Sequence, residues 1–146
     1  MPEARRTPVL AVGAVAQRDR ELLVIRRGHG PGAGQWSIPG GRVEFGEDVR
    51  EALVREVAEE TGLEVVVERF LGWVERIDGP RSHFVILDFV VDVLDPAQSP
   101  VAGCDASEAA WVPFDDLVEL PVVDGLLDFL ADHGVLAPDI DIDLRQ

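Results

Sequence analysis

The carboxylates of Glu56, Glu59 and Glu60 stand close together in the sequence and could bind a divalent metal ion. In a helix, Glu56 and Glu60 lie one turn apart and within roughly 40° of each other, at about 100° per residue. Glu59 lies on the flank nearest Glu56, so the three side chains can converge beside the helix. Like charges this close repel, and cations or protonation relieve the repulsion. Ligand sets made only of oxygen favour Mg²⁺ or Mn²⁺.

A helix must present these carboxylates, and the segment 48–61 has the features of one. It has no Gly or Pro, Ala and straight-chain residues dominate, acids lie in its first turn, and Gly62 follows as a C-terminal stop. Val49 and Leu53 lie on the side of Glu56 and Glu60, so these carboxylates border the buried stripe of the helix. The alternative is an acidic, solvated helix surface, which an isolated segment of this composition would favour.

The residues around this helix follow a fixed spacing. Gly41 to Leu63 reads GRVEFGEDVREALVREVAEETGL, which is Gly, five residues, Glu, seven residues, then Arg-Glu-aliphatic-any-Glu-Glu-any-Gly-aliphatic. This segment resembles the Nudix box at every defining position. Trp36, Pro39 and Gly40 also resemble the Trp-x-x-Pro-Gly-Gly segment that commonly precedes the box in this family.

The resemblance implies a role for each residue of the box. Arg55 resembles the residue that holds Glu47 and its loop against the helix with charge-assisted hydrogen bonds. The glycine pair would let a backbone carbonyl approach the metal closely, since glycine has no Cβ; an ordinary turn after Pro39 is the alternative. The metal ligands that the resemblance implies, for Mg²⁺ or Mn²⁺, are the carbonyl of Gly41 and the carboxylates of Glu56, Glu59 and Glu60.

The resemblance also implies an acid ahead of a late tryptophan strand, where it would accept a proton from the attacking water. Asp105 and Glu108 precede Trp111 at suitable distances, and Glu108 is our first choice. Glu59 or Glu60 takes this role instead if it releases a metal ion. Either loop acid could also serve only to keep the loop soluble.

Residues outside the box carry weaker signals for substrate binding. Arg26 and Arg27 end an expected strand beside a glycine-rich loop, where a guanidinium group could grip a diphosphate or simply be solvated. Trp36 could stack on a base or ribose, but we favour a place in the core beneath the loop. The candidate substrate contacts are Arg26, Arg27, Trp36, Arg42, Glu44 and Arg81.

The activity implied by the resemblance is metal-assisted attack of water on the diphosphate linkage of a nucleoside diphosphate derivative. Pro80 lies seventeen residues beyond Leu63, one residue from the place where ADP-ribose pyrophosphatases of this family often carry a proline. Hydrolysis of ADP-ribose to AMP and ribose 5-phosphate is therefore the preferred interpretation.

Three other activities remain as alternatives. The main one is a nucleoside triphosphate pyrophosphohydrolase that cleans the nucleotide pool and releases pyrophosphate. A non-catalytic nucleotide sensor would usually have a damaged box, and isomerases of isoprenoid diphosphates depend on a cysteine in a setting that Cys104 lacks. The chain has no tyrosine, which disfavours dinucleoside polyphosphate hydrolases.

The remaining pattern predicts the elements that position these residues. Strands are expected at 8–16, 21–26, 64–77, 82–94 and 109–112. Helices are expected at 48–61, 114–119 and 122–133, a glycine-rich loop at 28–35, and a frayed tail at 139–146. Strands of this order with helices on either side predict an α/β/α sandwich around a mixed sheet, which is also the architecture that the Nudix resemblance implies.

Length and composition fit one catalytic domain over residues 1–146, with the box at 41–63. A chain of 146 residues buries about 68–70% of its unfolded surface, enough for a core without disulfides. The lone Cys104 forms no internal bridge, and no signal peptide or membrane span is evident, so a reducing cytoplasm is expected. The absence of Lys, Asn and Tyr beside plentiful Arg, Ala, Gly and Pro suggests a bacterium with a GC-rich genome.

The net charge of −15 limits the partners of the chain. Acidic residues outnumber basic ones 28 to 13, which opposes binding to a nucleic-acid polymer. A small nucleotide substrate remains compatible, because bound metal ions invert the local field and a few arginines can hold phosphate. No membrane partner is expected, and a homodimer is one possibility, since relatives that act on ADP-ribose are often dimers.

Overall fold

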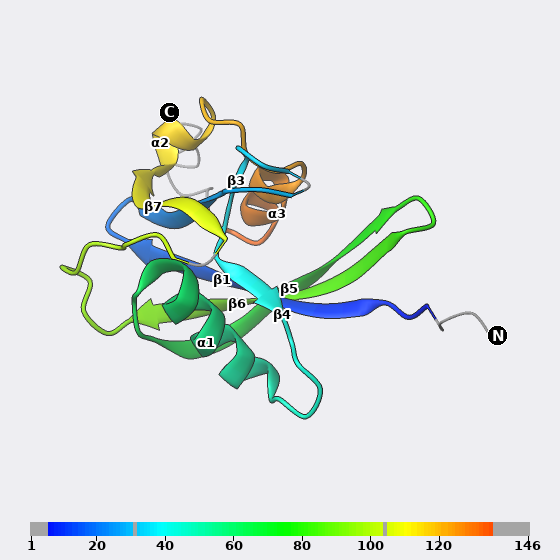
Figure 1. The fold of residues 1–146 in the computed structure, drawn as a ribbon. Coiled ribbons are helices and arrows are strands. Elements are labelled where there is room, and N and C mark those ends of the chain that lie inside the picture. Colours follow the sequence, from blue (N-terminus) through cyan, green and yellow to red (C-terminus); the bar gives the residue numbers. More distant parts are fainter. Residues whose placement is uncertain (1–5, 31, 104, 136–146) are drawn as a thin grey trace.

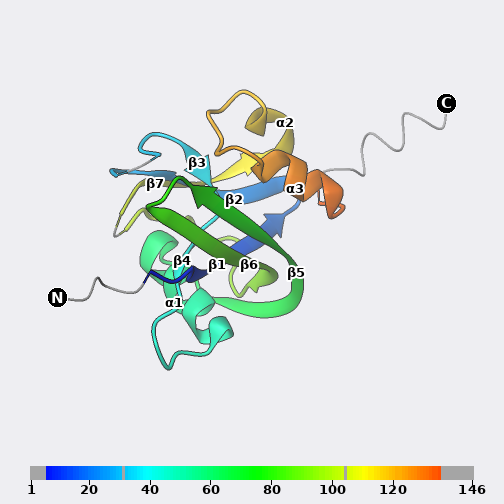
Figure 2. The same cartoon turned by 90° about the vertical axis from the view of Figure 1, so that its right-hand side faces the viewer.

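A computed structural model describes residues 6–30, 32–103 and 105–135 of the chain, so Cys104 and the tail expected at 139–146 lie outside the described residues. Strands fill the middle of the molecule, with α1 on one side and α2 and α3 on the other (Figure 1 and Figure 2). The strands are β1 (Val9–Arg18), β2 (Glu21–Arg27), β3 (Trp36–Ser37), β4 (Gly40–Arg42), β5 (Val65–Asp78), β6 (Ser82–Val93) and β7 (Ala106–Pro113). The helices are α1 (Val49–Thr61), α2 (Phe114–Leu117) and α3 (Leu126–Asp132).

The sheet is mixed, as the sequence predicts. Its strand order is β3-β2-β1-β6-β5, while β4 pairs with β1 and β7 pairs with β2. β1 and β6 run parallel, and the other described pairs are antiparallel. Helices on both sides of this sheet confirm the predicted sandwich. None of the helices in the described ranges is long and apolar enough to cross a membrane.

Two hydrophobic clusters lie on opposite sides of β1, because successive residues of a strand point to opposite faces. Val12, Ala14 and Ala16 belong to the cluster under α1, whereas Val15 belongs to the cluster under α2 and α3. Trp36 is buried in this second cluster, in agreement with the interpretation that it fills the core. β1 therefore contributes side chains to both hydrophobic clusters.

The helix α1 confirms the prediction for 48–61. The side chain of Asp48 caps its first turn by accepting a hydrogen bond of 2.7 Å from the backbone N–H of Arg50. Gly62 ends it in the left-handed conformation at φ 75°, with its N–H bonded to the carbonyl of Ala58. Both ends of α1 are thus fixed by residues that are adjacent in sequence.

The three main differences from the sequence prediction concern four elements. The helix expected at 122–133 begins only at Leu126, because Gly125 has a positive φ of 84° and Val123 donates its N–H to the carbonyl of Trp36. The strand expected at 109–112 begins at Ala106, where it pairs with Arg27 of β2. The short strands β3 and β4 were not predicted. All three differences depend on pairing between distant segments.

Candidate active site

A cavity of about 960 Å³ lies between the box and the sheet. At the box it is lined by Gly40, Gly41, Glu56 and Glu60, together with Arg27, Arg42, Glu44 and Asp105. On the side of β5, β6 and α3, apolar side chains that include Val74, Phe84, Ile86 and Phe129 lie beside the charged side chains of Glu75, Arg76, Asp88 and Asp124. The cavity is therefore charged where the motif lies, and it has both apolar and charged side chains where β5, β6 and α3 lie.

The glycine pair allows two close approaches. A Cβ on Gly41 would lie 2.3 to 2.6 Å from the carboxylate atoms of Glu56, and a Cβ on Gly40 would lie 2.1 Å from the carbonyl oxygen of Val12. The backbone N–H of Gly40 also donates a hydrogen bond of 2.9 Å to Glu60. Glycine is needed here because α1 and β1 pack directly against β4.

Arg55 binds the loop before the helix to the helix itself. Its Nε lies 2.8 Å and its Nη2 3.0 Å from the two carboxylate oxygens of Glu47. Its Nη2 also donates to the carbonyl of Arg42 at 3.2 Å, and Glu47 accepts from the backbone N–H of Glu44 at 3.0 Å. These hydrogen bonds lower the pKa of Glu47, with Arg55 as the largest cause. The geometry is the one that the resemblance implies for this pair.

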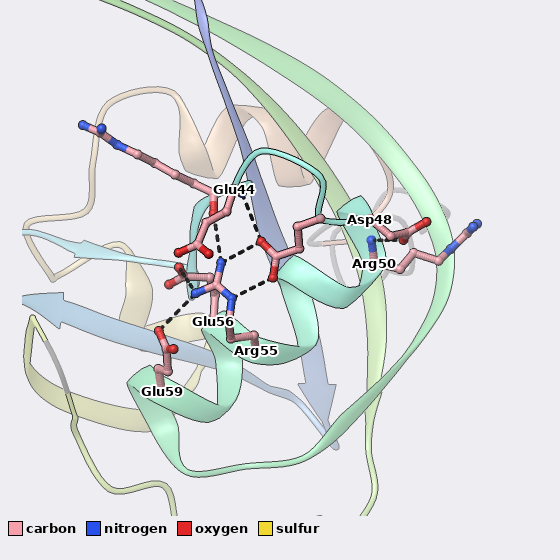
Figure 3. Close-up of polar contacts among 8 residues, drawn as sticks. Glu44, Asp48, Arg50, Arg55, Glu56 and Glu59 are labelled. Carbon is pink, nitrogen blue, oxygen red and sulfur yellow. Dashed lines mark hydrogen bonds and ion pairs between the residues drawn. The ribbon is translucent and has the colours of Figure 1, made fainter.

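The same arginine also faces two of the expected metal ligands (Figure 3). Nη1 of Arg55 lies 2.9 Å from Glu56 and 3.3 Å from Glu59. Burial raises the pKa of Glu56, and the bond to Arg55 opposes this change. The side chain of Glu59 is 43% exposed and lies outside the cavity lining. Arg55 thus neutralises part of the charge that these carboxylates carry.

Glu60 is the most buried acid of the box, with 9% of its surface exposed. Its pKa is raised to about 7, mainly by burial and also by the negative charge of Glu56, while the N–H of Gly40 and the charge of Arg27 oppose this change. A buried carboxylate with a like charge nearby is an unfavourable arrangement without a cation. Glu56 and Glu60 are therefore the two box acids that the cavity brings together.

The donor set at the box fits a hard divalent cation. Glu56 and Glu60 offer oxygen ligands that repel each other, and Glu59 can reach the same region from the exposed flank. Within the described residues, no three Asp, Glu, His or Cys side chains already stand close enough to form a complete metal site. To hold Mg²⁺ or Mn²⁺ together with Glu60, Glu56 and Glu59 would exchange their contacts with Arg55 for contacts with the metal.

The other predicted residues divide into two groups. Arg27, Arg42 and Glu44 line the cavity, whereas Arg26, Arg81 and Trp36 do not. Arg26 lies 3.0 Å from Glu108 in an ion pair between half-exposed side chains, and Glu108 also lies outside the cavity lining.

Asp105, the second candidate for the proton acceptor, does line the cavity and lies 3.3 Å from His29. Its negative charge contributes to the raised pKa of Glu60. Of the two loop acids, the structure brings Asp105 to the site, and it leaves Glu108 with Arg26.

Sequence reasoning missed Asp88, which lies in the middle of β6 and lines the cavity. It is 4% exposed, and burial raises its pKa to about 7. Its Oδ1 has no hydrogen-bond partner in the described part of the chain. The available signal was one acid within the apolar run FVILDFVV, since a charged residue inside such a strand needs a reason.

Comparison with known proteins gives related sequences and structures. Residues 7–133 match the family described as the NUDIX domain. The chain is 40% identical over 114 residues to the ADP-ribose pyrophosphatase of Methanocaldococcus jannaschii, a match that covers 77% of this chain and 66% of that protein. It is 32% identical over 107 residues to the CTP pyrophosphohydrolase of Escherichia coli, covering 70% of this chain and 79% of that protein.

A solved structure has the same fold. The MutT NUDIX hydrolase from Burkholderia pseudomallei superposes with a TM-score of 0.74 and 29% sequence identity. The superposition covers 86% of this chain and 98% of that one.

Proposed function

Because the chain belongs to the Nudix family of pyrophosphohydrolases, we propose that it hydrolyses the diphosphate bond of ADP-ribose to give AMP and ribose 5-phosphate. The observation that carries this choice of substrate is the 40% identity to an ADP-ribose pyrophosphatase. The match spans less than two thirds of that relative, so the substrate is our inference about this chain.

The charged end of the cavity supports hydrolysis of a diphosphate. A divalent ion held by Glu56, Glu59 and Glu60 would supply Lewis-acid activation of water and of the phosphoryl group. Arg27 and Arg42 line the same cavity and would neutralise the phosphate oxygens of the substrate. Positive charge from the two arginines and a bound cation suits a substrate that carries several negative charges.

In the proposed reaction, the oxygen of water forms a bond to one phosphorus, and the bond from that phosphorus to the bridging oxygen breaks. The proton of the water goes to a carboxylate, and the bridging oxygen leaves on the other phosphate. We place Asp105 ahead of Glu108 as the acceptor, because Asp105 lines the cavity and Glu108 is paired with Arg26. Comparing Asp105→Asn with Glu108→Gln would decide between them by the loss of kcat.

The test is an incubation of the purified protein with Mg²⁺ and ADP-ribose, followed by chromatography of the products. We expect AMP and ribose 5-phosphate in equal amounts, and no products when EDTA replaces Mg²⁺. Unchanged ADP-ribose, with turnover of another nucleotide in the same buffer, would refute the proposed substrate.

The second candidate is a nucleoside triphosphate pyrophosphohydrolase, favoured by the similarity to the CTP pyrophosphohydrolase of Escherichia coli. It predicts release of pyrophosphate from a nucleoside triphosphate. A panel of triphosphates assayed for pyrophosphate beside ADP-ribose assayed for AMP separates the two candidates, because the higher kcat/KM identifies the better substrate.

A further inference from the structure

Asp88 occupies an unusual position in the sheet, because both of its cross-strand neighbours are glycines. In the register of β6 with β1 it pairs with Gly13, and in the register of β6 with β5 it pairs with Gly72. Glycine weakens a strand interior, so a pair of them around one acid needs a structural reason. The result is a notch in the sheet with a single carboxylate in it.

The carboxylate fills the space above the first of these glycines. A Cβ on Gly13 would lie 2.2 Å from Oδ1 of Asp88, so no other residue fits at Gly13 without displacing that side chain. On the other side, a Cβ on Gly72 would lie 2.6 Å from Nε2 of His133. Asp88 therefore leans over β1, toward the part of the cavity that leads to the box.

The polar groups near Asp88 do not bond to it. The charges of His133 and Arg76 lower its pKa, against the larger effect of burial. Nδ1 of His133 is engaged with the carbonyl of Phe129 at 2.8 Å, and Arg76 donates to the carbonyl of Asp124. Among the residues that the structure describes, Oδ1 of Asp88 remains an unused acceptor, and such a group costs free energy unless a ligand bonds to it.

We propose that Asp88 accepts a hydrogen bond from the amino group of the nucleobase of the substrate, and so determines base specificity. This inference rests on the proposed function, because it assumes that the cavity holds a nucleotide.

Position and surroundings favour a base over the other parts of a nucleotide. Gly13 pairs with both Asp88 and Gly40, so two strand spacings of about 4.8 Å each separate Asp88 from the glycine that bonds to Glu60. A carboxylate repels phosphate, so the phosphates lie at the box and the base lies beyond the sugar. Phe84 and Phe129 line the same side of the cavity, and the parts of their rings that Arg42 and His133 do not cover offer apolar surface to a flat ring.

The protonation of Asp88 suits an adenine edge. Burial raises its pKa to about 7, so near neutral pH a large share of the carboxyl groups carry a proton. A protonated carboxyl offers one acceptor and one donor, which match the amino group and the adjacent ring nitrogen of adenine.

The test compares two ligands that differ in one group. Isothermal titration in Mg²⁺ buffer measures Kd for AMP and for purine riboside 5′-monophosphate, which lacks the amino group. For Asp88→Ala we expect Kd for AMP to rise about tenfold or more, and Kd for the second ligand to stay within about twofold. Asp88→Asn keeps an acceptor and a donor, so it should retain most of the affinity for AMP.

The matched control is Asp92→Ala, which changes an exposed acid of the same strand outside the cavity. It should leave both Kd values unchanged, and thermal unfolding of every variant verifies that the fold is intact. Equal losses for the two ligands in Asp88→Ala, an unchanged Kd for AMP, or no binding of AMP to the parent protein would each overturn the proposal.

The same measurements separate this inference from the proposed reaction. Binding of AMP that depends on Asp88, without hydrolysis of ADP-ribose, would leave the base contact standing and remove the proposed reaction. Hydrolysis of ADP-ribose with an unchanged KM in Asp88→Ala would support the proposed reaction and remove the base contact.

Discussion

The two ends of the cavity hold buried acids in opposite situations. At the box, Glu56 accepts a hydrogen bond from Arg55, and Glu60 accepts one from the N–H of Gly40. At the sheet, Asp88 has an unused oxygen. The box comes from residues that are near one another in sequence, whereas the surroundings of Asp88 come from the register of three strands. The spacing of residues along the sequence therefore determines the box end of the cavity, and the pairing of distant strands determines the Asp88 end.

The largest effect should come from removing charge at the box. We expect Glu56→Gln and Glu60→Gln to lower kcat about 100-fold or more at saturating Mg²⁺, because each loses anionic charge with little change in volume. Glu59→Gln should act in the same direction. Glu51→Gln, an exposed acid on the same helix, is the control. Kinetics with ADP-ribose give the values, and equal rates in parent and variants would remove the box acids from the reaction.

The next effect should come from the arginine that connects the loop to the helix. Arg55→Ala should lower the free energy of unfolding by about 2 kcal/mol, because it leaves Glu47 and Glu56 without their charge-assisted partner. It should also lower kcat by about 10 to 100-fold. Arg55→Lys should restore little, since an ammonium group cannot make the paired bonds to Glu47.

Urea denaturation and steady-state kinetics measure both effects of Arg55. Arg50→Ala is the matched control on the exposed side of the helix. Full stability in Arg55→Ala would contradict the role of the ion-pair network.

A glycine-to-alanine substitution at each end of the cavity tests whether the two ends have separate roles. Gly41→Ala places a Cβ against the carboxylate of Glu56, and Gly13→Ala places one against Oδ1 of Asp88. We expect Gly41→Ala to act mainly on kcat and Gly13→Ala mainly on KM, each by about tenfold. If both variants changed kcat and KM to the same extent, the two ends of the cavity would not have separate roles.

The last prediction concerns the pH dependence of stability. The pKa of Asp88 is about 7 in the folded protein, compared with 3.8 as its ordinary value, so the folded protein holds more protons between these values. Stability should therefore fall as pH rises from about 4 to about 7, and should then level off. The contribution is on the order of 4 kcal/mol for Asp88, at about 1.4 kcal/mol for each unit of pKa.

Asp88→Asn should remove this part of the pH dependence, as measured by urea denaturation at several pH values. Glu60 has a pKa of about 7 as well and contributes in the same direction. Added Mg²⁺ should diminish the share of Glu60 and leave that of Asp88. An identical pH profile in parent and Asp88→Asn would show that Asp88 ionises normally.

The sequence predicts the box helix well, because its cap at Asp48, its stop at Gly62 and its buried stripe are all local. It does not predict which loop acid reaches the cavity. Pairing of β2 with β7 shifts between Arg26 and Arg27, and this irregularity separates Glu108 from Asp105. Sequence spacing alone does not contain that shift.

The role of Asp88 could not be predicted from the sequence, because it too depends on strand pairing. Its strand was predicted correctly as an apolar segment, but the meaning of its one acid depends on Gly13 and Gly72, which lie far away in the chain. The start of α3 was misjudged in the same way, because Val123 bonds to Trp36 instead of continuing a helix. Both features depend on contacts between segments that are distant in the sequence, so the sequence alone does not predict them.

Arg55 has a consequence for how the protein matures. Because it lies between Glu47, Glu56 and Glu59, its guanidinium group is a counter-ion for the acids that we expect to bind a cation. Many small metal domains stay unfolded until the ion arrives. Here the chain supplies a positive charge of its own at these acids, so we expect the protein to fold before it binds the ion and to become active when Mg²⁺ is added to protein prepared in chelator.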